Sequence, residues 1–231
     1  MIIKSRLNNI DDIKIDNFVF NNNEIENIYV VIGCLDTIRG LIYAQELLKW
    51  CSKLYKYIFI VHQKAPGILF EYPALKYCEN LAKNSDKHIL YLHSKGASYP
   101  EDYIYNHHHA KYTRLLWKYC FYVNFKNYIA DNLTDDLMVI APFITTHKKN
   151  AYENNVTWLN GFLMTNKVWH NMNIQPDTGR YKYEGILNYY YLGDKKEVTK
   201  RWLIDDTVPE FNVCEFMRNK YNIDLDKYIG Y

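Results

Sequence analysis

A group of polar residues follows directly after an apolar stretch in the first half of the chain. Residues 89–92 (ILYL) are followed by His93, Ser94, Lys95 and Gly96. The lysine ammonium and the serine hydroxyl suit phosphate oxygens, and glycine lets the backbone turn sharply or approach a ligand closely. The spacing is not that of a P-loop. The pattern leaves two interpretations open: an anion-binding site, or a hydrophilic turn after a strand.

The elements that must position this group alternate between strands and helices. Residues 27–33, 55–63 and 88–96 begin with apolar, β-branched or aromatic runs, which predicts buried strands. Residues 36–54 and 72–85 have the periodicity of helices. This alternation predicts a parallel sheet covered on both faces, and ligands of such sheets bind beyond the carboxyl ends of the strands. The polar group would lie at that edge.

The second half of the chain is less regular. Residues 105–133 predict one long helix or two, and residues 136–144 predict a strand. A further strand over 155–164 leads into a short helix, and residues 179–194 predict another helix. Residues 195–231 have no pattern that assigns them to helix or strand.

Composition narrows the class of protein. Hydrophobic residues at 48% and charged residues at 23% are typical of a soluble globular chain. The net charge of +2 is scattered along the sequence, which argues against nucleic-acid binding but allows a local pocket for an anion. The five cysteines form no Cys-x-x-Cys motif, and no stretch is long and apolar enough to span a membrane. These features favour a cytoplasmic protein.

Three blocks resemble a group of bacterial and viral glycosyltransferases. Residues 71–98 (EYPALKYCENLAKNSDKHILYLHSKGAS) are similar to a block with a Glu-aromatic-Pro-x-Leu start, a helix, and a strand ending His-Thr/Ser-Lys-Gly. Residues 158–169 (WLNGFLMTNKVW) resemble a Ser-Gly-Asn-aromatic strand followed by a helix, although residues 159–162 depart from that pattern. Residues 180–187 (RYKYEGIL) resemble a later Arg-x-x-x-Glu helix. The resemblance covers residues 27–191.

The resemblance implies an α/β, GT-A-like fold: a mostly parallel, Rossmann-like sheet flanked by helices, in a single domain. Residues 1–26 would be a polar extension of the domain at 27–231, in which 27–145 bind the nucleotide-sugar and 146–231, more irregular, bind the acceptor. The activity implied is transfer of a hexose-type sugar from a nucleotide-sugar, UDP-linked, to a glycan or another hydroxyl acceptor.

In many GT-A enzymes the corresponding strand ends in Asp-x-Asp, which holds ribose and a divalent metal on the donor. His93, Ser94 and Lys95 stand there in this chain. A departing diphosphate needs positive charge near its oxygens, which Lys95 could supply directly. The expectation is a donor site without metal ligands, which requires no cofactor and for which Mn²⁺ is not favoured. Lys95 and Ser94 would hold the diphosphate, and His93 would contact ribose or phosphate, beside Gly96.

Four further donor-side residues each have a structural alternative. Asp36 would contact the base or ribose, or it would cap the helix that follows. Glu71 and Tyr72 would face the nucleotide, or they would cap the next helix. Arg180 would hold a phosphate, or it would pair with Glu184 one turn further along.

The acceptor side rests on the two later blocks. Glu184 matches the helix-borne Glu of the group and would activate the acceptor hydroxyl as general base, or it would be an exposed carboxylate paired with a basic residue. A retaining enzyme needs no such base, and the stereochemistry stays open. Trp158, Asn160 and Gly161 would bind the acceptor; Trp158 could stack on sugar, whereas Trp169 fits core packing better.

Other clusters are poorer candidates. The triplet His107-His108-His109 lacks the spacing of three or four that a helix needs to chelate a metal, so it predicts a solvated helix start. The pairs Asp135-Asp136 and Asp205-Asp206 read as turn carboxylates. A second function is a non-catalytic module that binds nucleotide-sugar or glycan on a degenerate fold. Nucleotidyl transfer is disfavoured because it requires paired carboxylates holding Mg²⁺.

Overall fold

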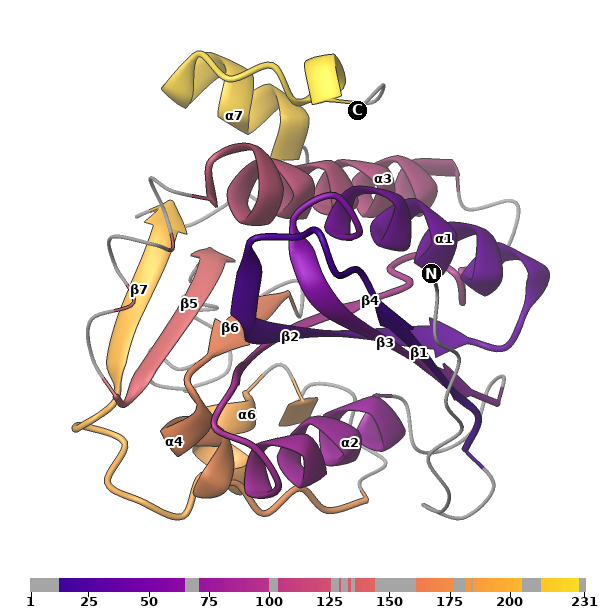
Figure 1. Cartoon of the computed structure of the whole chain (residues 1–231). Coiled ribbons are helices and arrows are strands. Elements are labelled where there is room, and N and C mark those ends of the chain that lie inside the picture. Colours follow the sequence, from indigo (N-terminus) through magenta and orange to yellow (C-terminus); the bar gives the residue numbers. More distant parts are fainter. Residues whose placement is uncertain are drawn as a thin grey trace.

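Within the described residues, seven strands form one mixed sheet, which lies between two layers of helices (Figure 1). This computed structural model describes residues 13–64, 71–99, 104–125, 129, 133, 136–143, 161–176, 182–183, 185–204 and 213–228. The expected α/β class and the single domain are confirmed by this arrangement.

The sheet has the strand order β1-β3-β2-β4-β6-β5-β7. Its core, β3-β2-β4, is parallel, and β5 is parallel to β7. The outer β1 is antiparallel to β3, and β6 is antiparallel to both of its neighbours, so the sheet is more mixed than the alternating pattern predicted. The strands are β1 (Ile15–Val19), β2 (Ile25–Leu35), β3 (Tyr55–Gln63), β4 (His88–His93), β5 (Met138–Phe143), β6 (Phe162–Met164) and β7 (Thr199–Ile204).

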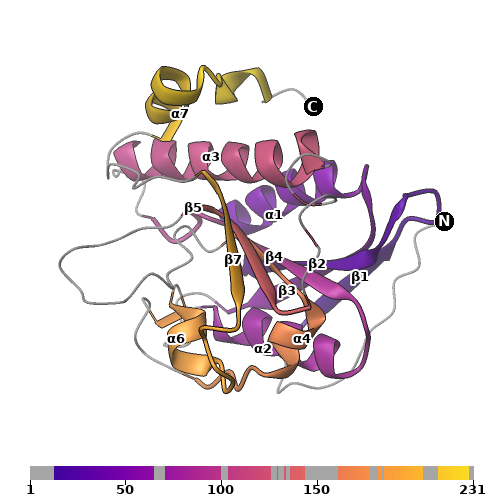
Figure 2. The ribbon, with the colours of Figure 1, turned by 90° about the vertical axis from the view of Figure 1, so that its left-hand side faces the viewer.

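Helices cover both faces of the sheet. In Figure 2, α1 and α3 lie on one face, with α7 outside α3, and α2, α4 and α6 lie on the other. Successive residues of a strand point to opposite faces, and in β2 both sets are apolar because both faces are covered: Val30 and Ile32 pack under α1 and α3, and Val31 packs toward α2. The helices are α1 (Ile38–Cys51), α2 (Tyr72–Lys83), α3 (Ile104–Lys118), α4 (Asn166–His170), α6 (Ile186–Tyr190) and α7 (Val213–Tyr221).

The predicted elements of the first half are confirmed as β2, α1, β3, α2 and β4. Thr37, rather than Asp36, caps α1, because its side-chain oxygen accepts a hydrogen bond from the N–H of Gly40 at 3.0 Å. The predicted long helix is α3, which continues into a π-helical turn, η1 (Tyr119–Val123).

Several elements lie where no pattern predicted them. Strand β1 falls within the first 26 residues, which were expected to be a polar extension. β7, α7 and the 3₁₀ turn η4 (Leu225–Tyr228) fall in the unassigned C-terminal part. The predicted strand over 155–164 is described only at its end, as β6. Trp169 is fully buried in the core, as expected.

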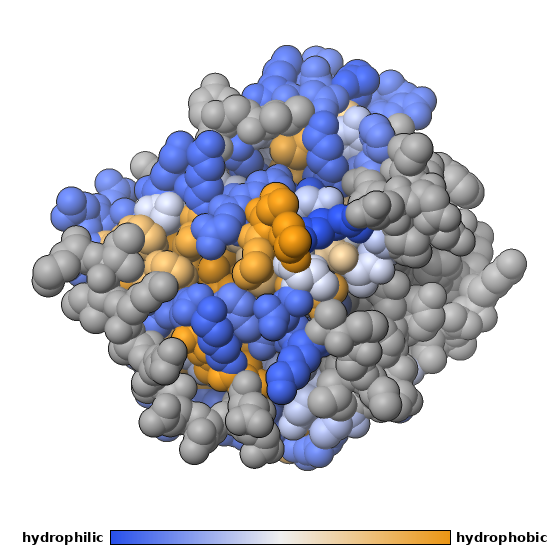
Figure 3. Space-filling view, turned by 90° about the vertical axis from the view of Figure 1, so that its right-hand side faces the viewer, coloured by the Kyte–Doolittle hydropathy of each residue, from blue (hydrophilic) through white to orange (hydrophobic). Residues whose placement is uncertain are grey.

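The described surface has few large exposed apolar side chains. Ile38 and Ile42 on α1 and Leu192 after α6 are the most exposed of them. On the face in Figure 3, apolar residues form groups bounded by hydrophilic ones. Among the helices that the structure describes, none is long and apolar enough to cross a membrane.

Candidate functional site

The order of the strands defines one special position at the carboxyl edge of the sheet. From β2 the chain passes through α1 to β3 on one side, whereas β4 pairs with β2 on the other side. α1 and α2 lie on opposite faces (Figures 1 and 2). In open α/β sheets, ligands bind in the crevice at this point, where the strand order reverses. The ends of β2 and β4 form it here, and His93 to Gly96 lie directly at it.

Ser94 joins the two strand ends. His93 is opposite Gly33 in the register, and beyond it the N–H of Ser94 donates to the carbonyl of Gly33 at 2.8 Å. The hydroxyl oxygen of Ser94 accepts a hydrogen bond from the N–H of Leu35 at 3.0 Å. Ser94 therefore fixes the spacing between β2 and β4, whatever it contributes to a ligand.

Gly96 shapes the turn that follows β4. Its φ of 91° lies in the region that favours glycine. A Cβ placed on Gly96 would also lie 2.5 Å from the Cβ of Ala110 on α3. The glycine is thus required because the turn packs closely against α3, a contact that the sequence did not suggest.

Lys95 is the most unusual side chain of the site. Only 6% of its surface is exposed. Its backbone carbonyl accepts a hydrogen bond from Nη1 of Arg114 at 2.5 Å, but its ammonium has no hydrogen bond or ion pair to any residue in the described part of the chain. Burying a charge without a partner is unfavourable, so this position is suited to an anion from outside the chain.

Further positive charge surrounds Lys95. Arg114, 4% exposed, donates from Nε to the Glu46 carboxylate at 2.9 Å, and its guanidinium lies 3.7 Å from the centre of the Tyr43 ring. Arg39, at the start of α1, donates to the carbonyl of Tyr99 at 2.6 Å. Two guanidinium groups therefore support the turn from α3 and α1. Because Arg114 and Glu46 neutralise each other, the remaining positive charge at this turn is that of Lys95 and of the half-buried Arg39.

His93 lies in a second cluster, on the other side of the β4 end. Its Nε2 is 3.9 Å from a carboxylate oxygen of Glu71, and its ring is stacked on Tyr91 and meets Trp117 edge-on at 5.3 Å. The hydroxyl of Tyr91 donates to the other oxygen of Glu71 at 3.4 Å. Burial and then the Glu71 carboxylate raise the pKa of Tyr91, so it remains a donor.

The α2 start brings Glu71 to this cluster. Glu71 precedes α2, but its side chain makes no capping hydrogen bond, so the capping alternative for this residue is wrong. Tyr72 is half-buried and packs against the core below the sheet. Glu71 lies beside His93.

Gly161 reaches the same cluster from the second half of the chain. A Cβ on Gly161 would clash with the indole of Trp117, whose other contacts include His93. The Nε1 of Trp117 is buried and has no hydrogen-bond partner. The indole of Trp117 therefore contacts both Gly161, which was expected on the acceptor side, and His93, which was expected on the donor side.

Asp36 is exposed at the end of β2, and its N–H donates to the carbonyl of Gln63 at 2.7 Å. Its backbone is therefore paired with the end of β3, while the preceding Leu35 is bonded to Ser94. Four other predicted site residues, Trp158, Asn160, Arg180 and Glu184, lie outside the described residues.

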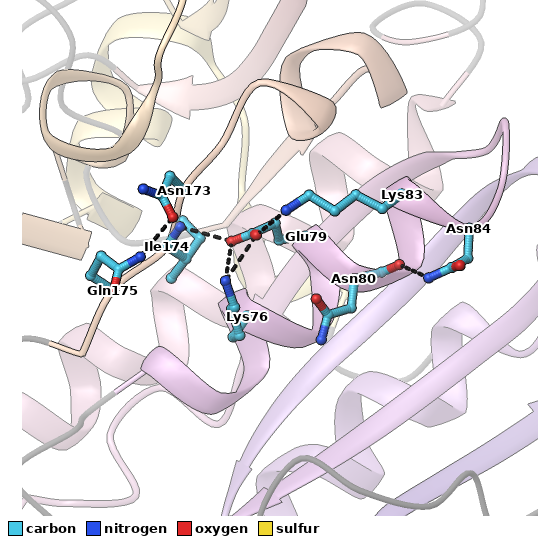
Figure 4. A network of polar contacts seen from close by, with 8 residues as sticks. All are labelled: Lys76, Glu79, Asn80, Lys83, Asn84, Asn173, Ile174 and Gln175. Carbon is cyan, nitrogen blue, oxygen red and sulfur yellow. Dashed lines mark hydrogen bonds and ion pairs between the residues drawn. The ribbon is translucent and has the colours of Figure 1, made fainter.

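A buried carboxylate ties α2 to the second half of the chain. Glu79 accepts hydrogen bonds from Lys76 at 2.8 Å, from Lys83, and from the N–H of Ile174 at 2.7 Å (Figure 4). Burial alone would raise the pKa of Glu79, but the two lysines and the Ile174 N–H lower it below its usual value. Helix α2, which follows Glu71, is thus anchored to the segment after α4.

One group far from the site could hold a cation by composition. Ligand atoms of Cys214, Asp224 and Asp226 lie within 4.8 Å of one another. However, Arg218 donates to Asp224 at 3.0 Å and to Asp226 at 3.4 Å, and burial and then Asp226 raise the pKa of the Cys214 thiol. A guanidinium already neutralises these carboxylates, so the group is an ion-pair cluster.

Of the predicted acidic pairs, Asp136 is exposed and pairs with Lys167, and Asp205-Asp206 lie outside the described residues.

Sequence reasoning missed the contribution of α3. His109, Arg114 and Trp117 all reach the site from this helix. Ala110, Thr113, Arg114 and Trp117 are buried and follow the i, i+3, i+4, i+7 pattern of one helix face. An arginine on an otherwise buried helix face was the signal that could have identified it.

Comparisons with known proteins give this chain no relatives: no protein-family model matches it, nor does any curated protein or any solved structure. The functional argument therefore rests on the fold and on the site.

Proposed function

We propose that this chain is a GT-A-like glycosyltransferase that binds a nucleotide-sugar, UDP-linked, at the carboxyl ends of β2 and β4 and transfers the sugar to a hydroxyl of a glycan or another acceptor. The observation that carries this proposal is the Lys95 side chain, which is 6% exposed, has no hydrogen bond or ion pair in the described part of the chain, and lies where the strand order reverses.

The fold supports the proposal because the first half of the chain forms the regular, parallel part of the sheet. The series β2-α1-β3-α2-β4 builds a parallel core suited to a nucleotide, and the antiparallel β6 brings Gly161 from the second half beside it. The resemblance of residues 71–98 supplies the class of reaction, because a cationic pocket by itself would serve many anions.

The geometry supports the proposed donor-side roles. Lys95 would balance the charge that develops on the diphosphate as the sugar departs, and the buried setting would strengthen that interaction. Glu71 would orient the imidazole of His93 toward the ribose or a phosphate. Asp36, exposed on the β3 side, would reach the base or ribose. Binding would require no metal.

The acceptor-side roles rest on the resemblance. Glu184 would be the general base of an inverting reaction, with Trp158, Asn160 and Gly161 around the acceptor. Arg180 would contact the donor phosphate or pair with Glu184.

A thermal-shift screen of nucleotide-sugars tests the proposal, with and without EDTA, on the wild type and Lys95→Ala. The matched control is Lys49→Ala, which removes an exposed lysine from the last turn of α1. We expect a UDP-sugar to stabilise the wild type and the control, regardless of EDTA, but not Lys95→Ala. Equal stabilisation of Lys95→Ala would contradict the role of Lys95. Loss with EDTA and recovery with Mn²⁺ would contradict metal-independent binding.

Turnover is tested separately. A UDP-sugar that stabilises the chain should release UDP when acceptors are screened, and Glu184→Gln should slow that release without weakening donor binding. Binding without hydrolysis or transfer, across donors and acceptors, would favour the non-catalytic module instead.

A further inference from the structure

The end of β3 carries a polar side chain without a hydrogen-bond partner. Gln63, the last residue of β3, is only 8% exposed, and its carboxamide makes no hydrogen bond to any residue that the structure describes. A carboxamide offers two N–H donors and one carbonyl acceptor, and leaving these groups unbonded in a nearly buried position is unfavourable. Gln63 is therefore suited to hydrogen bonds with a molecule from outside the chain.

Gly33 on β2 leaves room for this carboxamide. A Cβ placed on Gly33 would lie 2.8 Å from Nε2 of Gln63 and 3.2 Å from the hydroxyl oxygen of Tyr91. The same Cβ would lie 3.2 Å from the Cβ of Ala74 on α2, so it would have little space in which to move away. The absence of a side chain on Gly33 therefore keeps the carboxamide of Gln63 in its place at the strand end.

Backbone hydrogen bonds place Gln63 in one row with the anion site. Gln63 is opposite Leu35 in the register of β2 and β3, and its carbonyl accepts a hydrogen bond from the N–H of Asp36 at 2.7 Å. On the other side of β2, the N–H of Leu35 donates to the hydroxyl of Ser94, which precedes Lys95. The carboxyl ends of β3, β2 and β4 are thus joined in that order. Because neighbouring strands lie about 4.8 Å apart, roughly 10 Å separates the ends of β3 and β4.

This separation suits a nucleotide whose diphosphate lies at Lys95. The ribose and the first phosphate stand between the base and the terminal phosphate, so the base is the part of the nucleotide that reaches the end of β3. One edge of uracil carries the N3–H donor next to the O4 acceptor, and the carboxamide of Gln63 carries an acceptor next to a donor in one plane. Glutamine can therefore bind this edge through two hydrogen bonds, as carboxamides do with base edges in nucleic acids.

We propose that Gln63 recognises the uracil base of the donor nucleotide, with Oε1 accepting a hydrogen bond from N3–H and Nε2 donating one to O4. The inference rests on the proposed function and deepens it, because it names the residue that binds the nucleobase. Asp36, which is exposed at the adjoining end of β2, would then contact the ribose.

Calorimetric titration of the full chain with two nucleotides tests this inference. The nucleotides are UDP and 3-methyl-UDP, in which a methyl group replaces the N3 proton and removes the donor. The chains are the wild type, Gln63→Met, and the control Gln45→Met, which changes an exposed glutamine of α1. Methionine keeps the length of the side chain but has neither the N–H donors nor the carbonyl acceptor.

We expect the wild type and Gln45→Met to bind UDP about ten- to hundredfold more tightly than Gln63→Met does, which is the discrimination that a two-bond base contact gives. The wild type should bind 3-methyl-UDP about as weakly as Gln63→Met binds UDP, and Gln63→Met should bind the two nucleotides about equally. Circular dichroism checks that the variant is folded, and the comparison of the two nucleotides on the wild type needs no variant.

The outcomes separate this inference from the proposed function. Equal binding of UDP and 3-methyl-UDP by the wild type would overturn the role of Gln63. An equal loss of affinity for both nucleotides in Gln63→Met would also overturn it, because Gln63 would then contact the ribose or the diphosphate. If either result is found while Lys95→Ala does not bind UDP, the donor site stands without Gln63. If UDP does not bind to the wild type, both are wrong.

Discussion

Replacing Lys95 by methionine should make the unliganded protein more stable while it removes donor binding. Methionine keeps the length of the side chain but carries no charge. Lys95 is 6% exposed and its ammonium has no partner in the described structure, so removing the charge relieves the cost of holding it on a largely buried side chain. Such a buried unsatisfied group costs about 1–3 kcal/mol, and more when charged. For a domain of this size, that corresponds to a rise in Tm of roughly 2–10 °C.

Thermal and urea unfolding in buffer without phosphate measure the effect. Without ligand, Lys95→Met should unfold at a higher temperature and urea concentration than the wild type. With UDP at a hundred times its Kd, the wild type should gain about 2.7 kcal/mol and Lys95→Met nothing, so the difference between the two should shrink or reverse. The matched control Lys49→Met should stay within about 0.5 kcal/mol of the wild type in both conditions.

Two results would refute this reasoning. A less stable Lys95→Met without ligand would mean that the ammonium makes a favourable interaction within the chain. An equal response of both proteins to UDP would mean that the nucleotide binds elsewhere.

Three further variants test the supports of the site. Arg114→Lys keeps the charge but loses the planar contact with Tyr43 and the two hydrogen bonds to Glu46 and to the Lys95 carbonyl. Unfolding in urea should show a free energy of unfolding lower by about 2 kcal/mol, and titration should show weaker UDP binding. Gly96→Ala should lose about 1–3 kcal/mol from the positive φ and the clash with Ala110; Ala110→Gly in the same chain should restore only part of it, because the strain in φ remains. Glu79→Gln should lower stability at pH 7 by about 1–3 kcal/mol. Because the pKa of Glu79 in the folded protein lies below its usual 4.5, the contribution of Glu79 to stability is fully present above pH 4.5 and is lost as the pH falls below it. In unfolding series carried below pH 4.5, the wild type should therefore lose more stability than Glu79→Gln.

The sequence predicted the central strands well and the edge strands poorly. β2 and β4 are buried on both faces, so they are nearly continuous apolar runs that stand out in the sequence. The unpredicted β1 and β7 are the two edges of the sheet, and β1 is mostly half-buried. An edge strand needs fewer apolar residues, so its pattern is weak. The direction of β6 depends on how the chain returns to the sheet, which local periodicity does not encode.

The same limit applies to the site. The strand-end residues were identified because strand ends follow from chain order: Asp36 and His93 to Gly96 all lie at one edge. The contributions of α3 depend on contacts between distant parts of the chain. Arg114 binds Lys95 across 19 residues and Glu46 across 68, and no local pattern specifies such partners.

The distribution of carboxylates supports the proposal that this edge binds an anion without a metal. Of the described acidic side chains near the strand ends, Glu71 lies beside His93 and Tyr91, and Glu46 pairs with Arg114. Asp36 is exposed at the end of β2, where its backbone N–H donates to the carbonyl of Gln63. A divalent cation requires several oxygen ligands converging on one point, whereas Lys95 stands at the strand end itself. The charge of Lys95 therefore complements a phosphate group, whereas Glu71 and Glu46 already contact His93, Tyr91 and Arg114.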